Sequence, residues 1–510
     1  MTSFFRWAPM GAIVACTACG QSAPGEATAS QGAPVTVTVT TSVVVDSQSE
    51  EACKVSNTAA GGAGDLSCND DLLSADLGIT VADGERTWML FGDTFPVDAD
   101  GWPGGADATG YFTGLDPQAA VCGSGVDLVT VNGVGSAQTC GSQSLVYAPD
   151  PVFFTQSWPS TSIDDFVFQP AGSADGAAGE LPSNAAIPGA FEVPTGAFSY
   201  EGTVYTFYSG APGSLTSPVV GEDGLPSVSY LTSWTPPSTL APTWPPAYAP
   251  AAVSVPFTSA ESRQVVSMVD YVGLRPPTPA WSASSTFGGK FVQIAPVVSW
   301  PYLYLYGTGA YRSSHVYLAR LPLPEHGAPL AFSPYLSETP GFSVWNGSAW
   351  SSSPADAAPL AFSDDAAADV GELSVQQPLP GIWLMMYTPS LKGAFGGNVM
   401  VRWATSPSGP WSTMTSVLDV LAPASEGSYC CAGTPPGGCA GLELYGCYEG
   451  APIFGLYAPY MLPYVTPVSG NTVTVWYVIS GTYPYTTALM SFDVDIDVSV
   501  TVQGLASTPN

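Results

Sequence analysis

The chain has 510 residues, of which 10 are Lys or Arg, 41 are Asp or Glu and 2 are His, so its formal net charge at pH 7 is -31. A chain so acidic is repelled by nucleic-acid phosphates and by anionic lipid headgroups, which excludes both as partners. Gly (55) and Pro (49) are abundant and charged residues make up only 10%, a composition typical of a turn-rich β protein.

The first 19 residues are predicted to be an export signal. One cation, Arg6, precedes a short apolar run and small residues around two cysteines, as in a secretory precursor. The residues before Cys16 resemble a bacterial lipobox, in which the cysteine is lipidated, and Cys19 is a second candidate. We therefore expect an exported bacterial protein. It is either a cell-surface lipoprotein, held to the membrane only by an N-terminal lipid anchor, or a simply secreted protein.

Residues 20–50 are rich in small residues and predict a low-complexity tether. The alternation of Val and Thr over residues 35–45 is also a strand signal, so an edge strand is the alternative there. The folded domain is expected to span residues 51–510 as a single unit.

The remaining eight cysteines fall into three local clusters: Cys53 and Cys68; Cys122 and Cys140; Cys430, Cys431, Cys439 and Cys447. Disulfides are expected in an exported chain. Spacing favours Cys53 with Cys68 and Cys122 with Cys140, and leaves the pairing inside the last cluster open. A zinc site in the last cluster is the alternative, although export oxidises thiols and no His lies nearby.

Five similar passages follow along the chain, each pairing an apolar or aromatic strand with a second strand across a short turn. They cover residues 76–95, 194–210, 291–322, 372–388 continuing in 398–412, and 457–494. Each strand has the usual length, and Gly, Pro, Asn or Asp occupies the turns. The pattern predicts an all-β fold, and the internal repetition favours a five-bladed β-propeller with long, disulfide-braced loops.

Two aspartates in the first passage are the strongest candidates for chemistry. Asp93 ends an apolar strand, and Asp76 stands just before the strand that would pair with it. In an antiparallel hairpin the start of one strand lies beside the end of the next, so both carboxylates belong at one end of one sheet. Two such acids are what glycosidic cleavage requires. The alternative is that both accept backbone N–H bonds at turns.

The sequence resembles a known family through the segments ADLGI, LFGDTF, PTGAF, YLYGTGAYRSSHVYLARLP, DVGELSV, VRWATSPSGPWS, YAPYMLP and VISGTYPYTTALM. That family is catalogued as domain of unknown function 4185 and includes the endo-D-arabinanases of glycoside hydrolase family 183, which are five-bladed propellers. The resemblance implies that Asp76 and Asp93 are the essential carboxylates and that an arabinan-type envelope polysaccharide is the substrate. The chain departs from the family by Ala75 and by insertions at 122–140, 233–256 and 430–447.

Other residues are candidates for substrate binding. Glu372 begins the fourth passage and is either a third acid or a solvent-facing edge residue. Arg312 either orients a carboxylate or forms a surface ion pair. Aromatic residues that stack on sugars are expected among Trp102, Tyr457, Tyr460, Tyr483 and Tyr485, although such residues are often core.

No cofactor is expected, and the sequence gives only weak support for a structural calcium ion. Residues 98–101 resemble the start of a calcium loop but lack the later acidic ligand. Asp493, Asp495 and Asp497 alternate along a strand, which favours a solvated edge over a metal site. The expected protein is a monomeric glycoside hydrolase acting on D-arabinofuranosyl polysaccharide. The alternatives are a non-catalytic surface propeller that binds glycan or protein, and a glycosidase of another specificity on the same scaffold.

Overall fold

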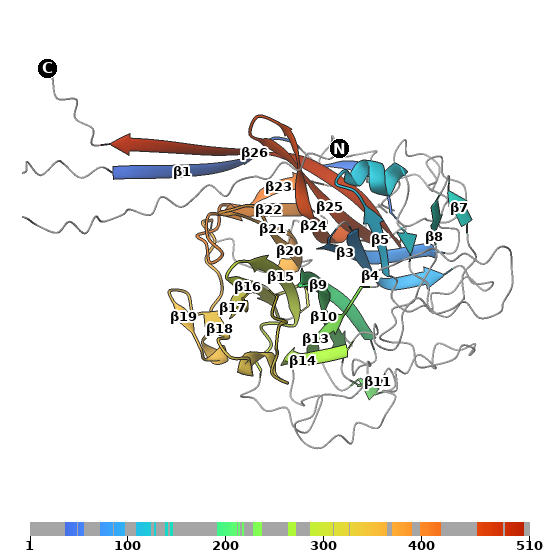
Figure 1. Ribbon diagram of the computed structural model, residues 1–510, viewed down its shortest axis with the longest axis horizontal. Coiled ribbons are helices and arrows are strands. Elements are labelled where there is room, and N and C mark those ends of the chain that lie inside the picture. Colours follow the sequence, from blue (N-terminus) through green and yellow to red (C-terminus); the bar gives the residue numbers. More distant parts are fainter. Residues whose placement is uncertain are drawn as a thin grey trace, which may run out of the picture. The chain divides into compact units, whose positions relative to one another are not determined.

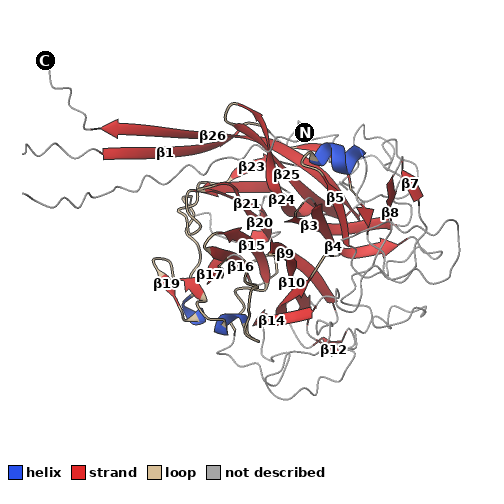
Figure 2. Ribbon diagram, viewed as in Figure 1, coloured by secondary structure: helices blue, strands red, loops and turns tan. Residues whose placement is uncertain are grey.

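In the computed structural model the strands dominate and helix is confined to short turns (Figure 2). The residues that the structure describes are 36–47, 49–55, 72–84, 86–96, 109–123, 127–128, 138–140, 143–145, 191–211, 213–214, 217–218, 228–236, 264–271, 286–309, 311–325, 327–364, 370–389, 398–419, 456–482 and 485–503. The predicted all-β class is confirmed for them. The chain divides into two units, residues 41–497 and residues 1–40 with 498–510. The described part of the second unit is residues 36–40 and 498–503.

Five larger antiparallel sheets follow one another along the described chain (Figure 1). The first contains β3 (Leu72–Asp83), β4 (Arg86–Pro96), β5 (Thr109–Thr113) and β6 (Asp127–Leu128). The second contains β9 (Phe191–Tyr200), β10 (Thr203–Ala211), β13 (Val228–Trp234) and β14 (Gln264–Tyr271). The third contains β15 (Gln293–Ser299), β16 (Tyr302–Thr308), β17 (Tyr317–Pro322), β18 (Ser343–Trp345) and β19 (Trp350–Ser351).

The fourth sheet contains β20 (Val370–Leu379), β21 (Ile382–Pro389), β22 (Val399–Ala404) and β23 (Thr415–Leu418). The fifth orders β24 (Leu456–Ser469), β25 (Thr472–Thr482), β26 (Tyr485–Gln503) and β1 (Thr36–Val45), and β2 (Glu50–Lys54) also pairs with β26. β1 therefore corresponds to the edge-strand alternative for residues 35–45. Two small hairpins join β7 (Gln138–Cys140) to β8 (Gln143–Leu145) and β11 (Gly213–Ser214) to β12 (Ser217–Pro218).

The first strand of each larger sheet contacts the first strands of two other sheets. We call β3, β9, β15, β20 and β24 the inner strands. β3 contacts β9, β9 contacts β15, β15 contacts β20, β20 contacts β24, and β24 contacts β3. The inner strands thus form a cycle, with each sheet extending from it through its second, third and fourth strands.

Apolar side chains fill the spaces between neighbouring sheets. One cluster joins the second sheet to the third through Phe207 and Leu305, and another joins the third to the fourth through Tyr306 and Trp411. Further clusters join the fourth to the fifth and the fifth to the first. The first and second sheets meet where Trp88 packs edge-on against Trp234, with ring centroids 4.9 Å apart. Because each fully buried large side chain stabilises the fold by roughly 1.5–3 kcal/mol, these layers hold the sheets together.

The cysteine predictions are not tested. Cys53 lies on β2 and Cys122 on the π-helical turn η2 (Gln118–Gly123), and these two elements contact each other. Cys140 lies on β7. The other body cysteines, Cys68, Cys430, Cys431, Cys439 and Cys447, lie outside the described residues, as do Cys16 and Cys19. The pairings stay predictions.

A buried carboxylate organises the segment that leads into β15. Asp270 on β14 is 0% exposed, and its two oxygens accept backbone N–H bonds from Tyr271, Phe287, Gly289, Lys290 and Phe291 at 2.6–3.1 Å. These bonds hold residues 286–291 in a loop that places the buried rings of Phe287 and Phe291 against the third sheet. The loop therefore depends on one side chain far away in sequence.

We expect Asp270→Asn to lower the free energy of unfolding by about 2–4 kcal/mol, because the new amide NH2 would face backbone donors that need an acceptor. Urea unfolding followed by tryptophan fluorescence measures the change. Glu325→Gln, the same kind of change at an exposed residue, should shift stability by less than about 0.5 kcal/mol. Equal effects of the two substitutions would contradict this role for Asp270.

Arg402 on β22 is fully buried and is held by an acid from the segment before β20. Its Nη1 donates to Asp364 Oδ1 at 2.8 Å and to the Ser412 carbonyl at 2.7 Å, and its Nε donates to the Tyr387 hydroxyl at 2.9 Å. Burial alone would raise the pKa of Asp364, but the bonds from Arg402 and from the Met414 N–H outweigh it and hold that pKa below its ordinary value.

This pair gives a pH dependence of stability. A carboxyl whose pKa is lowered on folding stabilises the protein above its unfolded pKa, about 3.9, and loses that contribution as the pH falls through the folded value. We expect Asp364→Asn to cost about 2–4 kcal/mol at pH 7, because Arg402 stays buried, and progressively less below pH 4. Urea unfolding of both proteins from pH 3 to pH 7 tests this. A pH-independent difference would contradict it.

Candidate functional site

The two predicted aspartates lie opposite each other in the first sheet. In the pairing of β3 with β4, Ala75 faces Thr94 and Leu77 faces Phe91. Asp76 is therefore opposite the two residues Gly92 and Asp93, at a bulge in the ladder. This end of the sheet is the one remote from the β3–β4 turn, as the hairpin argument predicted.

The backbone beside Asp76 is strained. Leu77 has φ 66° and Gly78 has φ 73°, and a bulky residue rarely adopts a positive φ. The Leu77 N–H donates to Ser480 Oγ of β25 at 2.7 Å. A Cβ at Gly78 would lie 2.7 Å from Val478 Cγ1, so glycine is required for β3 to pass this close to β25.

Two further non-glycine residues with positive φ, Arg312 at 50° and Ala458 at 57°, lie at the same end of the inner strands. Among the described residues the only other one is Glu201, in the β9–β10 turn. Strained backbone of this kind gathers at functional sites, where the surrounding structure enforces it. The strain therefore marks the same end of the cycle as the two aspartates.

An ion pair joins the third sheet to the fourth at this end. Arg312 follows β16, and its Nε donates to Glu372 Oε1 at 2.7 Å. Glu372 stands at the start of β20 and is 3% exposed, and its other oxygen lies 3.5 Å from the Thr388 hydroxyl. Glu372 is therefore not a solvent-facing edge residue, and Arg312 does not form a surface pair. The structure brings these two candidates together.

The Arg312 guanidinium also packs on two aromatic rings. Its carbon lies 4.7 Å from the ring centre of Tyr311 and 4.7 Å from that of Tyr457, at the start of β24. Burial alone would lower the pKa of Arg312, but the negative charge and hydrogen bond of Glu372, with the two tyrosines, raise it above its ordinary value. Arg312 is thus a fixed cation whose charge Glu372 balances.

These contacts form one continuous set. Tyr457 pairs with Ser480 across β24 and β25, Ser480 accepts the Leu77 N–H, and Leu77 packs with Tyr457 in one apolar cluster. We call Asp76, Asp93, Arg312, Glu372 and Tyr457 the strand-start site, because it lies where the inner strands begin.

Two residues at equivalent places were missed by the sequence analysis. Glu192 occupies the second position of β9 and Gln293 the first position of β15, just as Asp76 and Glu372 lie near the starts of β3 and β20. Gln293 is buried and its Oε1 lies 3.4 Å from the Thr308 hydroxyl. The signal that would have found them is a polar residue directly before an apolar inner strand.

The remaining candidates for substrate binding lie in different places. Tyr460 packs in the same cluster as Tyr457 because a bulge and the positive φ of Ala458 interrupt the alternation of β24, but it lines a cavity further along the strand. Tyr485 is the first residue of β26. Trp102 and Tyr483 lie outside the described residues, so their proposed roles are untested.

The described residues contain no group of three His, Cys, Asp or Glu that could hold a metal ion. The hydroxyls of Thr474 and Thr472 donate to Asp493 and Asp495, and the Asn471 amide donates to Asp497. β26 lies between β25 and β1, so the prediction of a sheet edge is wrong, although Asp497 is exposed and Asp493 and Asp495 are partly exposed. Residues 98–101 lie outside the described part. None of the described helices is long and apolar enough to span a membrane.

The family described as Domain of unknown function (DUF4185) matches residues 259–491. The predicted resemblance is confirmed over this segment, which contains Arg312, Glu372 and Tyr457, whereas Asp76 and Asp93 precede it. No curated protein matches the sequence.

Three solved structures to which this chain is similar are the following. A proposed hydrolase from Bacteroides ovatus ATCC 8483 has a TM-score of 0.43 and 11% identity, over 83% of this chain and 86% of that one. The catalytic domain of the Coprinopsis cinerea GH62 α-L-arabinofuranosidase has a TM-score of 0.34 and 9% identity, over 87% and 98%. A thermostable family-43 glycoside hydrolase has a TM-score of 0.30 and 12% identity, over 86% and 95%.

The Arg312–Glu372 pair should stabilise the fold measurably. In a double-mutant cycle with Arg312→Met and Glu372→Gln, we expect a coupling energy of about 1–3 kcal/mol from urea unfolding, because both charges are largely removed from water. The more exposed pair of Arg86 with Asp83, 3.3 Å apart, is the control and should give about 0.5 kcal/mol or less. Equal coupling energies in the two pairs would show that the Arg312–Glu372 pair contributes no more to stability than a more exposed pair does.

Proposed function

We propose that the protein is an exported glycoside hydrolase that cleaves D-arabinofuranosyl linkages in arabinan-type cell-envelope polysaccharide. Asp76 and Asp93 are its two carboxylates. The observation that carries this proposal is the register of β3 with β4, which sets Asp76 opposite Gly92 and Asp93. Residues that face each other on antiparallel strands have Cα atoms about 4.5–5.5 Å apart, so the two acids are attached to the backbone close together at one end of the sheet.

We infer that the five larger sheets are the blades of a five-bladed propeller. The cyclic contacts of the inner strands support this arrangement, as does the order of strands within each sheet. In such a fold the starts of the inner strands converge at one end of the central axis, which brings residues from different blades to one substrate. The convergence of Leu77, Arg312, Glu372 and Tyr457 from four sheets agrees with this geometry.

The chemistry requires the two aspartates to differ in protonation. One carboxylic acid gives its proton to the glycosidic oxygen as the C–O bond breaks. The other, ionised, either attacks the anomeric carbon or removes a proton from the water that does so, and one water is consumed per bond cleaved. Two neighbouring carboxylates favour this split, because the charge of one raises the pKa of the other.

Arg312 and Glu372 would bind and orient the sugar. Arg312 donates through Nε to Glu372, and its terminal nitrogens donate to none of the described residues, so they are available to sugar hydroxyls. Because Glu372 balances the charge of Arg312, the pair favours an uncharged ligand. A neutral arabinan fits a chain of net charge -31 better than an anionic glycan would.

The remaining assignments are proposals of the same kind. The protein would act as a monomer without a cofactor, outside the cell, either anchored by a lipid on Cys16 or Cys19 or secreted. The resemblance to the family is the support for the arabinofuranosyl substrate.

Release of reducing ends from mycobacterial arabinogalactan tests the activity. We expect Asp76→Asn and Asp93→Asn each to lower kcat about a thousandfold or more, because each removes a group that takes part in proton transfer or attack. Asp83→Asn is the matched control: it lies on the same strand as Asp76 but at the turn end, paired with Arg86, and should leave kcat unchanged.

Each other outcome identifies a different error. Binding of arabinogalactan without release would support a non-catalytic glycan-binding propeller. Release that survives both substitutions would show that other groups do the chemistry. Release only from other glycans would retain the two carboxylates and replace the substrate.

A further inference from the structure

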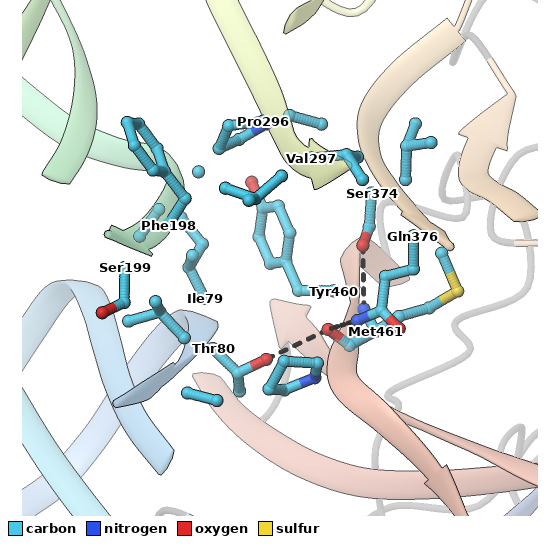
Figure 3. Close-up of a pocket in the computed structure, with 18 of the residues that line it drawn as sticks. Ile79, Thr80, Phe198, Ser199, Pro296, Val297, Ser374, Gln376, Tyr460 and Met461 are labelled. Carbon is cyan, nitrogen blue, oxygen red and sulfur yellow. Dashed lines mark hydrogen bonds between the residues drawn. The ribbon is translucent and has the colours of Figure 1, made fainter. Parts of the chain in front are cut away.

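A cavity of about 240 Å³ lies among the later parts of the inner strands, which lead into their hairpin turns (Figure 3). Each inner strand contributes to its wall: residues 79–82 of β3, 195–199 of β9, 295–298 of β15, 373–377 of β20, and 460, 461 and 463 of β24. These residues follow the strand starts and approach the turns that end the inner strands. The wall contains none of the strand-start site residues, so the cavity is a separate place in the fold.

The cavity wall carries hydrogen-bonding groups but no acid or base other than a tyrosine. Three of these groups converge on the backbone of Met461 (Figure 3). Thr80 Oγ1 donates to the Met461 carbonyl at 3.0 Å, Gln376 Nε2 donates to the same oxygen at 2.8 Å, and the Met461 N–H donates to Ser374 Oγ at 3.0 Å.

After these bonds are made, the wall still has hydrogen-bond donors and acceptors without a partner among the described residues. Ser374 is 7% exposed, and its O–H donates to none of the described residues. The carbonyl oxygen of the Gln376 amide likewise accepts from none of them, and Thr80 Oγ1 keeps its lone pairs. A buried wall that offers both a donor and acceptors is suited to a hydroxyl group, which is itself both.

Apolar surface completes the cavity. The ring of Tyr460 extends into its middle, with the hydroxyl toward Val297, and Phe198 stands at the side (Figure 3). At the turn ends of β15 and β20, three large apolar side chains are exposed: Val298 is 39%, Trp300 55% and Leu379 39% exposed. Val298 belongs to the cavity wall, and Trp300 follows it by two residues. Uncharged polar groups beside aromatic faces match the two surfaces of a sugar ring.

We propose that this cavity is a second binding site that takes one neutral sugar residue, at the opposite end of the inner strands from the strand-start site. Its volume is below the about 300–1,000 Å³ of sites for larger ligands, which suits a single residue rather than an oligosaccharide. A charged group would be buried here without a partner, at a high cost in free energy. The choice of a sugar rests on the proposed function, whereas the neutrality and size of the ligand rest on the cavity.

Saturation-transfer NMR titrations with D-arabinose, and with D-glucuronate as the anionic probe, test the proposal on the mature protein. We expect saturable binding of D-arabinose and at least tenfold weaker binding of D-glucuronate. Ser374→Ala removes the unused donor, and Trp300→Ala removes the exposed ring without touching the core. Each should weaken D-arabinose binding at least fivefold.

Two controls separate this site from the rest of the molecule. Val44→Ala changes another exposed apolar residue, 54% exposed on β1, and should leave binding unchanged. Asp93→Asn changes the strand-start site and should keep the component of D-arabinose binding that Ser374→Ala and Trp300→Ala weaken. No binding by the parent protein, equal binding of D-glucuronate, or binding lost in Asp93→Asn but kept in Ser374→Ala and Trp300→Ala would each overturn the second site. Binding that persists in a protein inactive on arabinogalactan would support this site while the proposed hydrolase fails.

Discussion

The close approach of the inner strands is the constraint on which the rest of the structure depends. Five strands from five sheets can meet in a cycle only if their backbones come nearer than most side chains allow. At Gly196 on β9, a Cβ would lie 2.2 Å from the Ile294 carbonyl oxygen of the next inner strand. At Gly78 on β3, a Cβ would lie 2.7 Å from the Cγ1 methyl of Val478 on β25. Larger residues there would push neighbouring sheets apart and open the apolar layers between them.

The close packing of the inner strands also brings together the residues of the strand-start site. Where the inner strands begin, Leu77, Arg312 and Ala458 adopt positive φ, and residues from different sheets come within bonding distance. The Arg312–Glu372 pair is one result, and the Leu77–Ser480 bond is another. The site is therefore held by the packing that closes the cycle, and the strain beside Asp76 is compensated by the bond to Ser480.

Local sequence signals were sufficient for the first two or three strands of each larger sheet and for the relation of Asp76 to Asp93, but not for outer strands such as β13, β14 and β23. Both aspartates lie on one hairpin, so the antiparallel rule alone placed them at the same end. The pair of Arg312 with Glu372 could be named residue by residue but not joined, because 60 residues separate them and only the packing of two sheets brings them together. Tyr457 and Tyr460 were predicted to act alike. No local pattern signals the bulge and the positive φ at Ala458. Because of them, Tyr457 contacts Arg312 and Tyr460 lines the cavity. Asp270 was missed because its five partners are backbone groups, which leave no mark in the sequence.

The chain has few cations, and those whose side chains the structure describes all have protein partners. The whole chain has 10 Lys and Arg against 41 acids. Among the side chains that the structure describes, Arg86, Arg312 and Arg402 each pair with an acid. Lys290 donates to the carbonyls of Ala355 and Ala357, and Arg320 lies between the rings of Tyr302 and Trp350, at 4.2 and 4.0 Å.

Each of these five cations thus has protein partners, and an acid balances the charge of Arg86, Arg312 and Arg402. A phosphate or carboxylate on a ligand would be repelled by that acid in each of the three pairs. Separating a buried charge from its partner is costly, whereas a sugar hydroxyl carries no charge that competes with the acids of these pairs. Among the described cations, the scarcity of unbalanced positive charge therefore supports the proposal of a neutral ligand, for a reason independent of the family resemblance.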